Sequence, residues 1–260
     1  MPVIGLREDR CLQPIVQAMR DVEEDFMNYT DAQRIERVWA AVSTQLTGLG
    51  VPAPRLEVGI YPGLNGQFLF STWTLRASAS LAAIKLMERA NANRKKEIFA
   101  QLGDTLSHEA RHCEQWWRMA LLVITKKWLK DRIKPTAAQL DTLGISGPII
   151  QRALTAPPLS PMAMDETEAW YQSVYGGGSS FRDVNVYGRN LRPSGPTRVG
   201  GRQEDVGAVF RDTEFARYEQ GLAEEADAHA TGRRVQTLYL QGSTVQVQPL
   251  VGHRRPKGTY

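Results

Sequence analysis

The amino-acid sequence predicts an α+β fold that is mainly helical, with a small β-sheet edge beside one long helix. The segment from Asn93 to Leu129 contains no proline and a single glycine, Gly103, and its apolar residues recur at helical spacing. Two short segments before it are typical of β-strands, since one alternates in polarity and the other is rich in β-branched and aromatic residues. Helical periodicity also appears on both sides of these segments.

The N-terminal region, residues 11–49, is predicted to form two helices. The first has Pro14 at its start, and the second follows Thr30, which can form a capping box with Gln33. Gly50 and the two prolines that follow it stop the second helix. We therefore expect an N-terminal helical region, residues 1–50, that packs on a core formed by residues 51–260.

The predicted strands come next and precede the long helix. Leu56–Tyr61 alternates in polarity, residues 62–66 form a turn, and Gln67–Leu75 is rich in β-branched and aromatic residues.

The C-terminal half is predicted to hold further helices and one long loop. The expected helices are Ala137–Leu143, Gly147–Leu154, Asp165–Gln172 and Thr213–Arg234. Residues 176–206 are rich in Gly, Ser, Pro and Arg, which indicates a mobile loop that is either a lid over a site or simply disordered. A terminal strand pair is expected within Val235–Val251, around Gly242.

The long helix carries His108-Glu109-Ala110-Arg111-His112, an H-E-x-x-H pattern. Two histidines four residues apart lie on the same helix face, so both imidazoles can bind one metal ion. Glu109 lies at the edge of that face, where a metal-activated water would sit. The pattern is that of a zinc hydrolase, with Zn²⁺ bound by His108 and His112 and with Glu109 as the general base.

The residues of this helix fall into three sectors when placed at 100° intervals. The sector expected to be buried comprises Phe99, Leu102, Leu106, Cys113, Trp117 and Ile124. The sector expected to face solvent comprises Ser107, Arg111, Glu114 and Arg118. The histidines occupy a third sector near Met119, which favours a ligand role over the competing interpretation of a buried, hydrogen-bonded pair.

A third protein ligand is needed, because catalytic zinc takes three and leaves one position for water. No histidine follows the motif before His229, so an acidic ligand from another helix is expected. Two segments share the pattern E-x-[D/E]-A followed by an aromatic ring, one starting at Glu166 and the other at Glu225.

Three patches, LSHEARHCEQWWRMA, EAWYQSVYG and LAEEADAHATG, resemble the zincin-type HExxH metallopeptidase domains of bacterial polymorphic toxins and secretion-system effectors. The resemblance does not extend to the N-terminal hundred residues. It implies a zincin-like domain whose edge strand binds an extended substrate. A helix reading P-x-E-x-D-A often supplies the third ligand in such domains. The resemblance assigns that ligand to Glu225, with Ala223 in place of the proline, and makes Asp227 a second-shell partner that orients a histidine. Glu166, which is closer to His112 in the sequence, is the alternative ligand.

A peptidase also needs a donor for the developing oxyanion. The candidates are Tyr218 and Tyr175, followed by Tyr171 and His229.

Composition limits where the chain is made and what it binds. Two cysteines imply no disulfide framework, and neither a signal peptide nor a membrane-spanning run is apparent. We expect synthesis in the cytoplasm and export, if any, by a specialised secretion system. The net charge of +4 comes largely from residues 182–202 and 253–257, where no aromatic interleaving supports nucleic-acid binding.

The function predicted first is that of a zinc-dependent metallopeptidase acting as a toxin or effector. Its expected partners are a protein or peptide substrate, with a secretion-system carrier or an immunity protein as further partners. One alternative is an amidase of cell-wall peptides. The other is a non-catalytic cargo or structural protein of a secretion apparatus, with a relict metal site.

Overall fold

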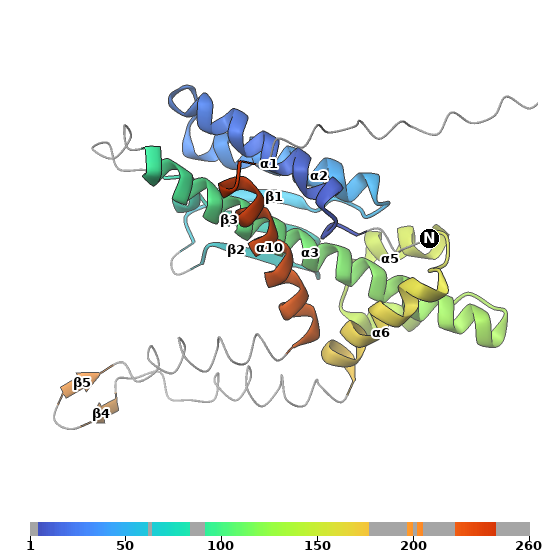
Figure 1. Ribbon diagram of the computed structural model, residues 1–260. Helices are drawn as coiled ribbons and strands as arrows, with labels where there is room; N and C mark the ends of the chain where they lie inside the picture. Colours follow the sequence, from blue (N-terminus) through green and yellow to red (C-terminus); the bar gives the residue numbers. More distant parts are fainter. Residues whose placement is uncertain are drawn as a thin grey trace, which may run out of the picture.

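The computed structural model describes residues 5–61, 64–83, 92–176, 197–199, 202–204 and 222–242. The chain is mainly helical with a small, mixed, three-stranded sheet, which confirms the α+β class (Figure 1). The long helix α3, Ala92–Asp131, runs through the middle of the molecule and contacts helices from both ends of the chain. The helices and strands around the candidate site therefore pack on α3.

The two predicted N-terminal helices are present. They are α1, Asp9–Glu24, and α2, Asp31–Gly48, joined through a 3₁₀ turn, η1, Phe26–Asn28. The capping box is confirmed, since Thr30 Oγ1 accepts the N–H of Gln33 and Gln33 Oε1 accepts the N–H of Thr30. The predicted start at Pro14 is wrong, because α1 begins at Asp9 and Pro14 lies inside it.

The sheet differs from the predicted strand pair. Its strands are β1, Arg55–Gly59, β2, Gly66–Leu69, and β3, Thr74–Ser78, in the order β1-β3-β2. β3 lies parallel to β1 and antiparallel to β2. The segment predicted as one strand is a hairpin because the chain turns at Trp73, whose φ is 54°. This turn lets the Trp73 ring pack edge-on against Phe68, 5.0 Å away, and donate to Pro52 O.

The predicted apolar sector of α3 is buried, as expected, but the predicted solvent sector is buried too. Arg111 and Glu114 are fully inaccessible, and Arg118 is 7% exposed. Periodicity shows that a face is polar without showing what covers it. Here that face is covered by α10, α6 and the N-terminal segment, which bring carboxylates and arginines of their own. The solvent assignment was therefore wrong.

The elements after α3 follow the predictions with shifted ends. They are α4, Ala137–Leu140, the 3₁₀ turn η4, Asp141–Leu143, α5, Gly147–Thr155, and α6, Pro161–Tyr175. A further 3₁₀ turn, η2, Ala79–Ala82, follows the sheet. Helix α6 begins earlier than predicted because Ser160 caps it through the N–H of Ala163 and Pro161 occupies the first helical position.

Helix α10, Ala223–Leu240, is the last described helix and extends past its predicted end at Arg234. Val235, Leu238 and Tyr239 are buried at helical spacing, so the strand predicted from Val235 is wrong for this part. The rest of that strand pair, from residue 243, lies outside the described residues, as does the predicted helix before residue 222.

The predicted loop, residues 176–206, falls largely outside the described residues. Its described part includes one antiparallel pair, β4, Thr197–Val199, with β5, Arg202–Glu204.

Helices α10 and α3 cross in close contact because glycines lie at the crossing (Figure 1). A methyl group on Gly232 would lie 2.7 Å from Asp104 O, and one on Gly103 would lie 3.0 Å from Val235 Cγ1. The small residues let the two backbones approach, which brings the first turn of α10 onto the histidine face of α3.

The residues before and after position 51 share one hydrophobic core, in which α1 packs on α3 and α10 and α2 packs on α1 and α3. Cys11 and Cys113 are both buried free thiols, as expected for Cys113. Within the described part of the chain, no helix combines the length and apolarity needed to span a bilayer.

Candidate metal centre

Three of the predicted ligands lie together where α3 and α10 meet. His112 Nε2 is 3.1 Å from His108 Nε2 and 3.1 Å from Glu225 Oε2, and His108 Nε2 is 3.6 Å from the same carboxylate oxygen. One ligand atom from each residue lies within 4.8 Å of the others, so the group could hold a metal ion. Two imidazole nitrogens and one carboxylate are a donor set that zinc accepts, and it leaves room for a fourth ligand. The donor set therefore fits a metal ion such as zinc.

Glu166, the alternative third ligand, lies among arginines instead. Its carboxylate is 2.7 Å from Arg7 Nη1 and 3.0 Å from Arg118 Nη1. The negative charge of this carboxylate is therefore already balanced by the two guanidinium groups. The structure thus brings Glu225, and not Glu166, to the two histidines.

Glu109 lies between α3 and the edge strand β2. Its Oε2 accepts the backbone N–H of Phe68 at 2.8 Å. Gly66, on the same strand, has no room for a side chain, because a methyl group there would lie 2.6 Å from Thr105 Cγ2 and 3.1 Å from Glu109 Cγ. The glycine therefore lets β2 approach the helix, and the strand in turn fixes the general base predicted from the motif.

His112 is oriented by a residue that sequence reasoning missed, Gln115. Gln115 Nε2 donates to Glu224 O at 2.9 Å and to Asp227 Oδ2 at 2.8 Å, so its Oε1 faces His112 Nδ1, 2.9 Å away. Since Oε1 can only accept, Nδ1 carries the proton and Nε2 is directed at the group. The spacing of three residues on one helix could have identified this partner.

Asp227, predicted to orient a histidine directly, acts one step farther away. Its carboxylate binds Gln115 and accepts two hydrogen bonds from Arg111, at 2.6 and 3.3 Å. Arg111 also donates to Glu114, which accepts the N–H of Leu6 at 2.9 Å. This buried network fastens α10 and the N-terminal segment to α3, on the side of the helix next to the histidines.

The electrostatics favour one protonated histidine, His112, beside the Glu225 carboxylate and a neutral His108. Burial and the charge of His112 lower the pKa of His108 to about 3, against the opposing effect of Glu225. Burial also lowers the pKa of His112, but the charge and hydrogen bond of Glu225 outweigh it and bring the value to about 9. At neutral pH both ring nitrogens of His112 therefore carry a proton, and a metal ion has to displace the one on Nε2 to bind there. Burial raises the pKa of Glu109, partly offset by His112 and by the N–H of Phe68, as suits a proton acceptor.

One wall beside the histidines is aromatic. The Trp116 ring lies edge-on to His112 at 5.7 Å and stacks on Phe70 at 5.2 Å. Phe68 closes the same wall, 6.5 Å from Trp116. Such an apolar surface strengthens electrostatic interactions in the group next to it.

The candidate oxyanion donors lie in different parts of the structure. Tyr175 donates its hydroxyl to Leu143 O at 2.7 Å, and Tyr171 lines a hollow beside the last turns of α3. Tyr218 lies outside the described residues. His229 is the candidate next to the group, because it follows Glu225 by one turn and its ring lies 4.4 Å from that of His108.

Replacing Gln115 with leucine is expected to weaken metal binding by roughly 10–100-fold, the usual cost of losing a partner that orients a ligand. Leucine cannot accept the Nδ1 proton, so the His112 ring loses the contact that fixes it. Isothermal titration with zinc measures the change, and Gln17→Leu, at an exposed position on α1, is the matched control. Unchanged affinity in Gln115→Leu would show that packing alone orients the ring.

No family model, curated protein or solved structure matches this chain.

Proposed function

We propose that the chain is a zinc-dependent metallopeptidase in which His108, His112 and Glu225 hold the metal and Glu109 is the general base. The observation that carries this proposal is the convergence of these three side chains from α3 and α10, with Glu109 beside them. Two histidines from an H-E-x-x-H helix with a glutamate from another helix are the ligand arrangement of hydrolytic zinc sites.

When bound, zinc supplies a Lewis acid that polarises a carbonyl group and lowers the pKa of a water molecule to about 7. Glu109 accepts the proton of the attacking water and later delivers it to the amine nitrogen that leaves. The N–H of Phe68 holds the Glu109 carboxylate in place before and after this transfer. The proton taken from water thus ends on the leaving amine. The hydroxyl group of the water becomes part of the new carboxylic acid at the cleaved carbonyl carbon.

The edge strand β2 suits an extended peptide as the substrate. It pairs with β3 along one side, and its Phe68 N–H faces the catalytic glutamate rather than β3. An extended peptide is the substrate we expect, because the edge of β2 lies next to Glu109 and the histidines. A zincin-like fold and a toxin or effector role remain part of the proposal, supported by the resemblance of the three sequence patches.

The test is cleavage of a mixed peptide library by the purified full chain, with new amino termini identified by mass spectrometry. We expect cleavage that a chelator abolishes and that added zinc restores. Cleavage of cell-wall cross-linking peptides, but not of the library, would assign the amidase chemistry instead. Bound zinc without turnover of either substrate would favour a non-catalytic role.

A further inference from the structure

The C-terminal end of α3 and the residues just after it expose large apolar side chains among cations. Trp128 is 40% exposed, Leu129 52% and Ile133 68%. Five cationic residues surround them in the sequence, and we call all eight residues the basic–apolar tip: Lys126, Lys127, Trp128, Leu129, Lys130, Arg132, Ile133 and Lys134. Elsewhere in the described residues, large exposed apolar side chains are scattered singly, at Met27, Ile60, Met162 and Leu240. Figure 1 shows this end of α3 at the margin of the molecule, away from the sheet.

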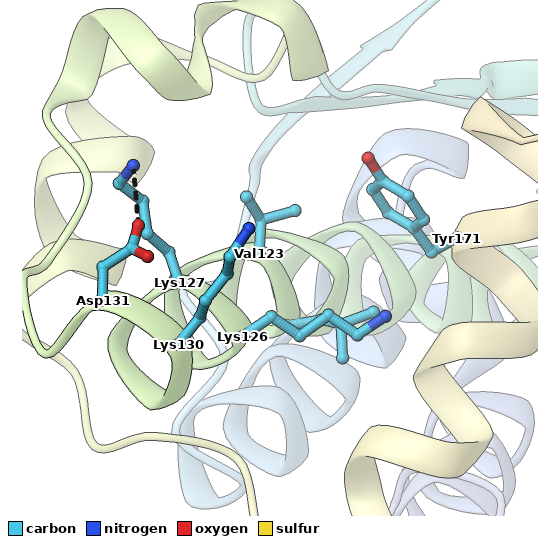
Figure 2. Close-up of a pocket in the computed structure, with 7 residues that line it drawn as sticks. Val123, Lys126, Lys127, Lys130, Asp131 and Tyr171 are labelled. Carbon is cyan, nitrogen blue, oxygen red and sulfur yellow. Dashed lines mark ion pairs between the residues drawn. The ribbon is translucent and has the colours of Figure 1, made fainter.

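A cationic hollow of about 340 Å³ lies on one side of the tip. Figure 2 shows Lys126, Lys127, Lys130, Asp131 and Tyr171 around it, with Asp131 paired to Lys127. Lys127 pairs with Asp131 and Lys126 with Glu168, so the five cations of the tip outnumber the carboxylates that pair with them. The hollow therefore offers ammonium groups and a phenol hydroxyl to an anion.

An apolar hollow of about 230 Å³ lies on the adjoining face of the same helix. Its lining is Leu121, Ile124, Thr125, Trp128, Lys134, Ala156, Pro157 and Pro158. The last turns of α3 thus line two hollows. One is cationic, and the other, on the adjoining face, is apolar. This combination fits a molecule that joins an anionic head to a hydrocarbon chain.

We propose that the basic–apolar tip binds the surface of a bilayer that contains anionic phospholipids. Trp128, Leu129 and Ile133 insert at the level of the headgroups, and the lysines extend their stems over apolar surface to reach lipid phosphates. An acidic protein partner would satisfy the cations but would leave the exposed apolar side chains and the apolar hollow without a role. The tip is separate from the metal group, since Lys126 lies about 20 Å along the helix from His112 at 1.5 Å per residue.

The experiment is co-sedimentation of the full chain with vesicles of phosphatidylcholine alone and of phosphatidylcholine mixed with phosphatidylserine. We expect binding to the mixed vesicles and little to the neutral ones. Lys130→Gln with Arg132→Gln should lower the partition coefficient roughly fivefold for each charge removed. Leu129→Ser with Ile133→Ser should lower it roughly tenfold or more, because exposed apolar area is lost.

Two matched controls keep this test specific. Ile60→Ser with Leu240→Ser removes exposed apolar area elsewhere, and Arg10→Gln with Lys96→Gln removes two exposed charges elsewhere. Both double variants should bind like the unaltered chain.

Equal binding to neutral and mixed vesicles, or no effect of the tip variants, would overturn the proposal. So would binding to soluble polyphosphate that is equally strong and insensitive to Leu129→Ser with Ile133→Ser, since that result would define a site for acidic macromolecules.

Discussion

Replacing Glu109 with glutamine is expected to lower the rate of peptide hydrolysis by roughly 10²–10⁴-fold, the contribution usual for a general base. The amide oxygen of glutamine can still accept the N–H of Phe68, so the side chain keeps its place between α3 and β2. What it loses is the capacity to take a proton from water. Metal content is expected to stay the same, because Glu109 is not one of the three grouped ligands.

The measurement is the initial rate on a peptide that the unaltered chain cleaves, together with zinc per chain by elemental analysis. Glu36→Gln, at an exposed position on α2, is the matched control and should leave both values unchanged. Full activity in Glu109→Gln would remove the general-base role. Loss of zinc along with activity would instead make Glu109 part of the metal site.

Replacing His112 with alanine, or Glu225 with alanine, is expected to abolish stoichiometric zinc binding. Each change removes one of three ligands, and we expect a loss larger than the roughly 10–100-fold seen for supporting partners. Zinc binding by the unaltered chain should also strengthen as the pH rises towards 9, because the proton that Glu225 holds on His112 leaves more readily. Elemental analysis and zinc titration at several pH values measure both effects.

Glu166→Ala is the matched control, because it removes a glutamate that the sequence made an equivalent candidate but that lies against Arg7 and Arg118. It should keep the zinc and lower the stability of the fold, since Arg7 and Arg118 each lose one of their carboxylate partners. Loss of zinc in Glu166→Ala with binding kept in Glu225→Ala would contradict the arrangement seen here. Circular dichroism of each variant separates loss of the site from loss of the fold.

The secondary structure near the motif was predictable because its causes are local. The span of α3 follows from a proline-free stretch with helical periodicity, and the start of α2 follows from the Thr30–Gln33 box. The hairpin turn at Trp73 was missed because no glycine or proline marks it. Its reason is tertiary, a Trp73 ring packed on Phe68 and bonded to Pro52 O.

The polar face of α3 was misassigned for the same kind of reason. Arg111 and Glu114 form an ion pair within one helix, which on a solvated surface would contribute little. Their burial depends on Asp227, more than a hundred residues away, and on the N–H of Leu6. Neither partner is visible in the local sequence pattern.

The sequence by itself determined the histidine pair and its adjacent glutamate, because helical geometry places residues four apart on one face whatever the rest of the chain does. It also reduced the third ligand to two similar segments. Only the tertiary structure chose between them: the glycines at the crossing of α3 and α10 allow close packing, and the Arg111–Asp227 pair fastens α10 to α3. The meeting of Glu225 with His112 is set by packing between segments far apart in the chain, which no local periodicity encodes.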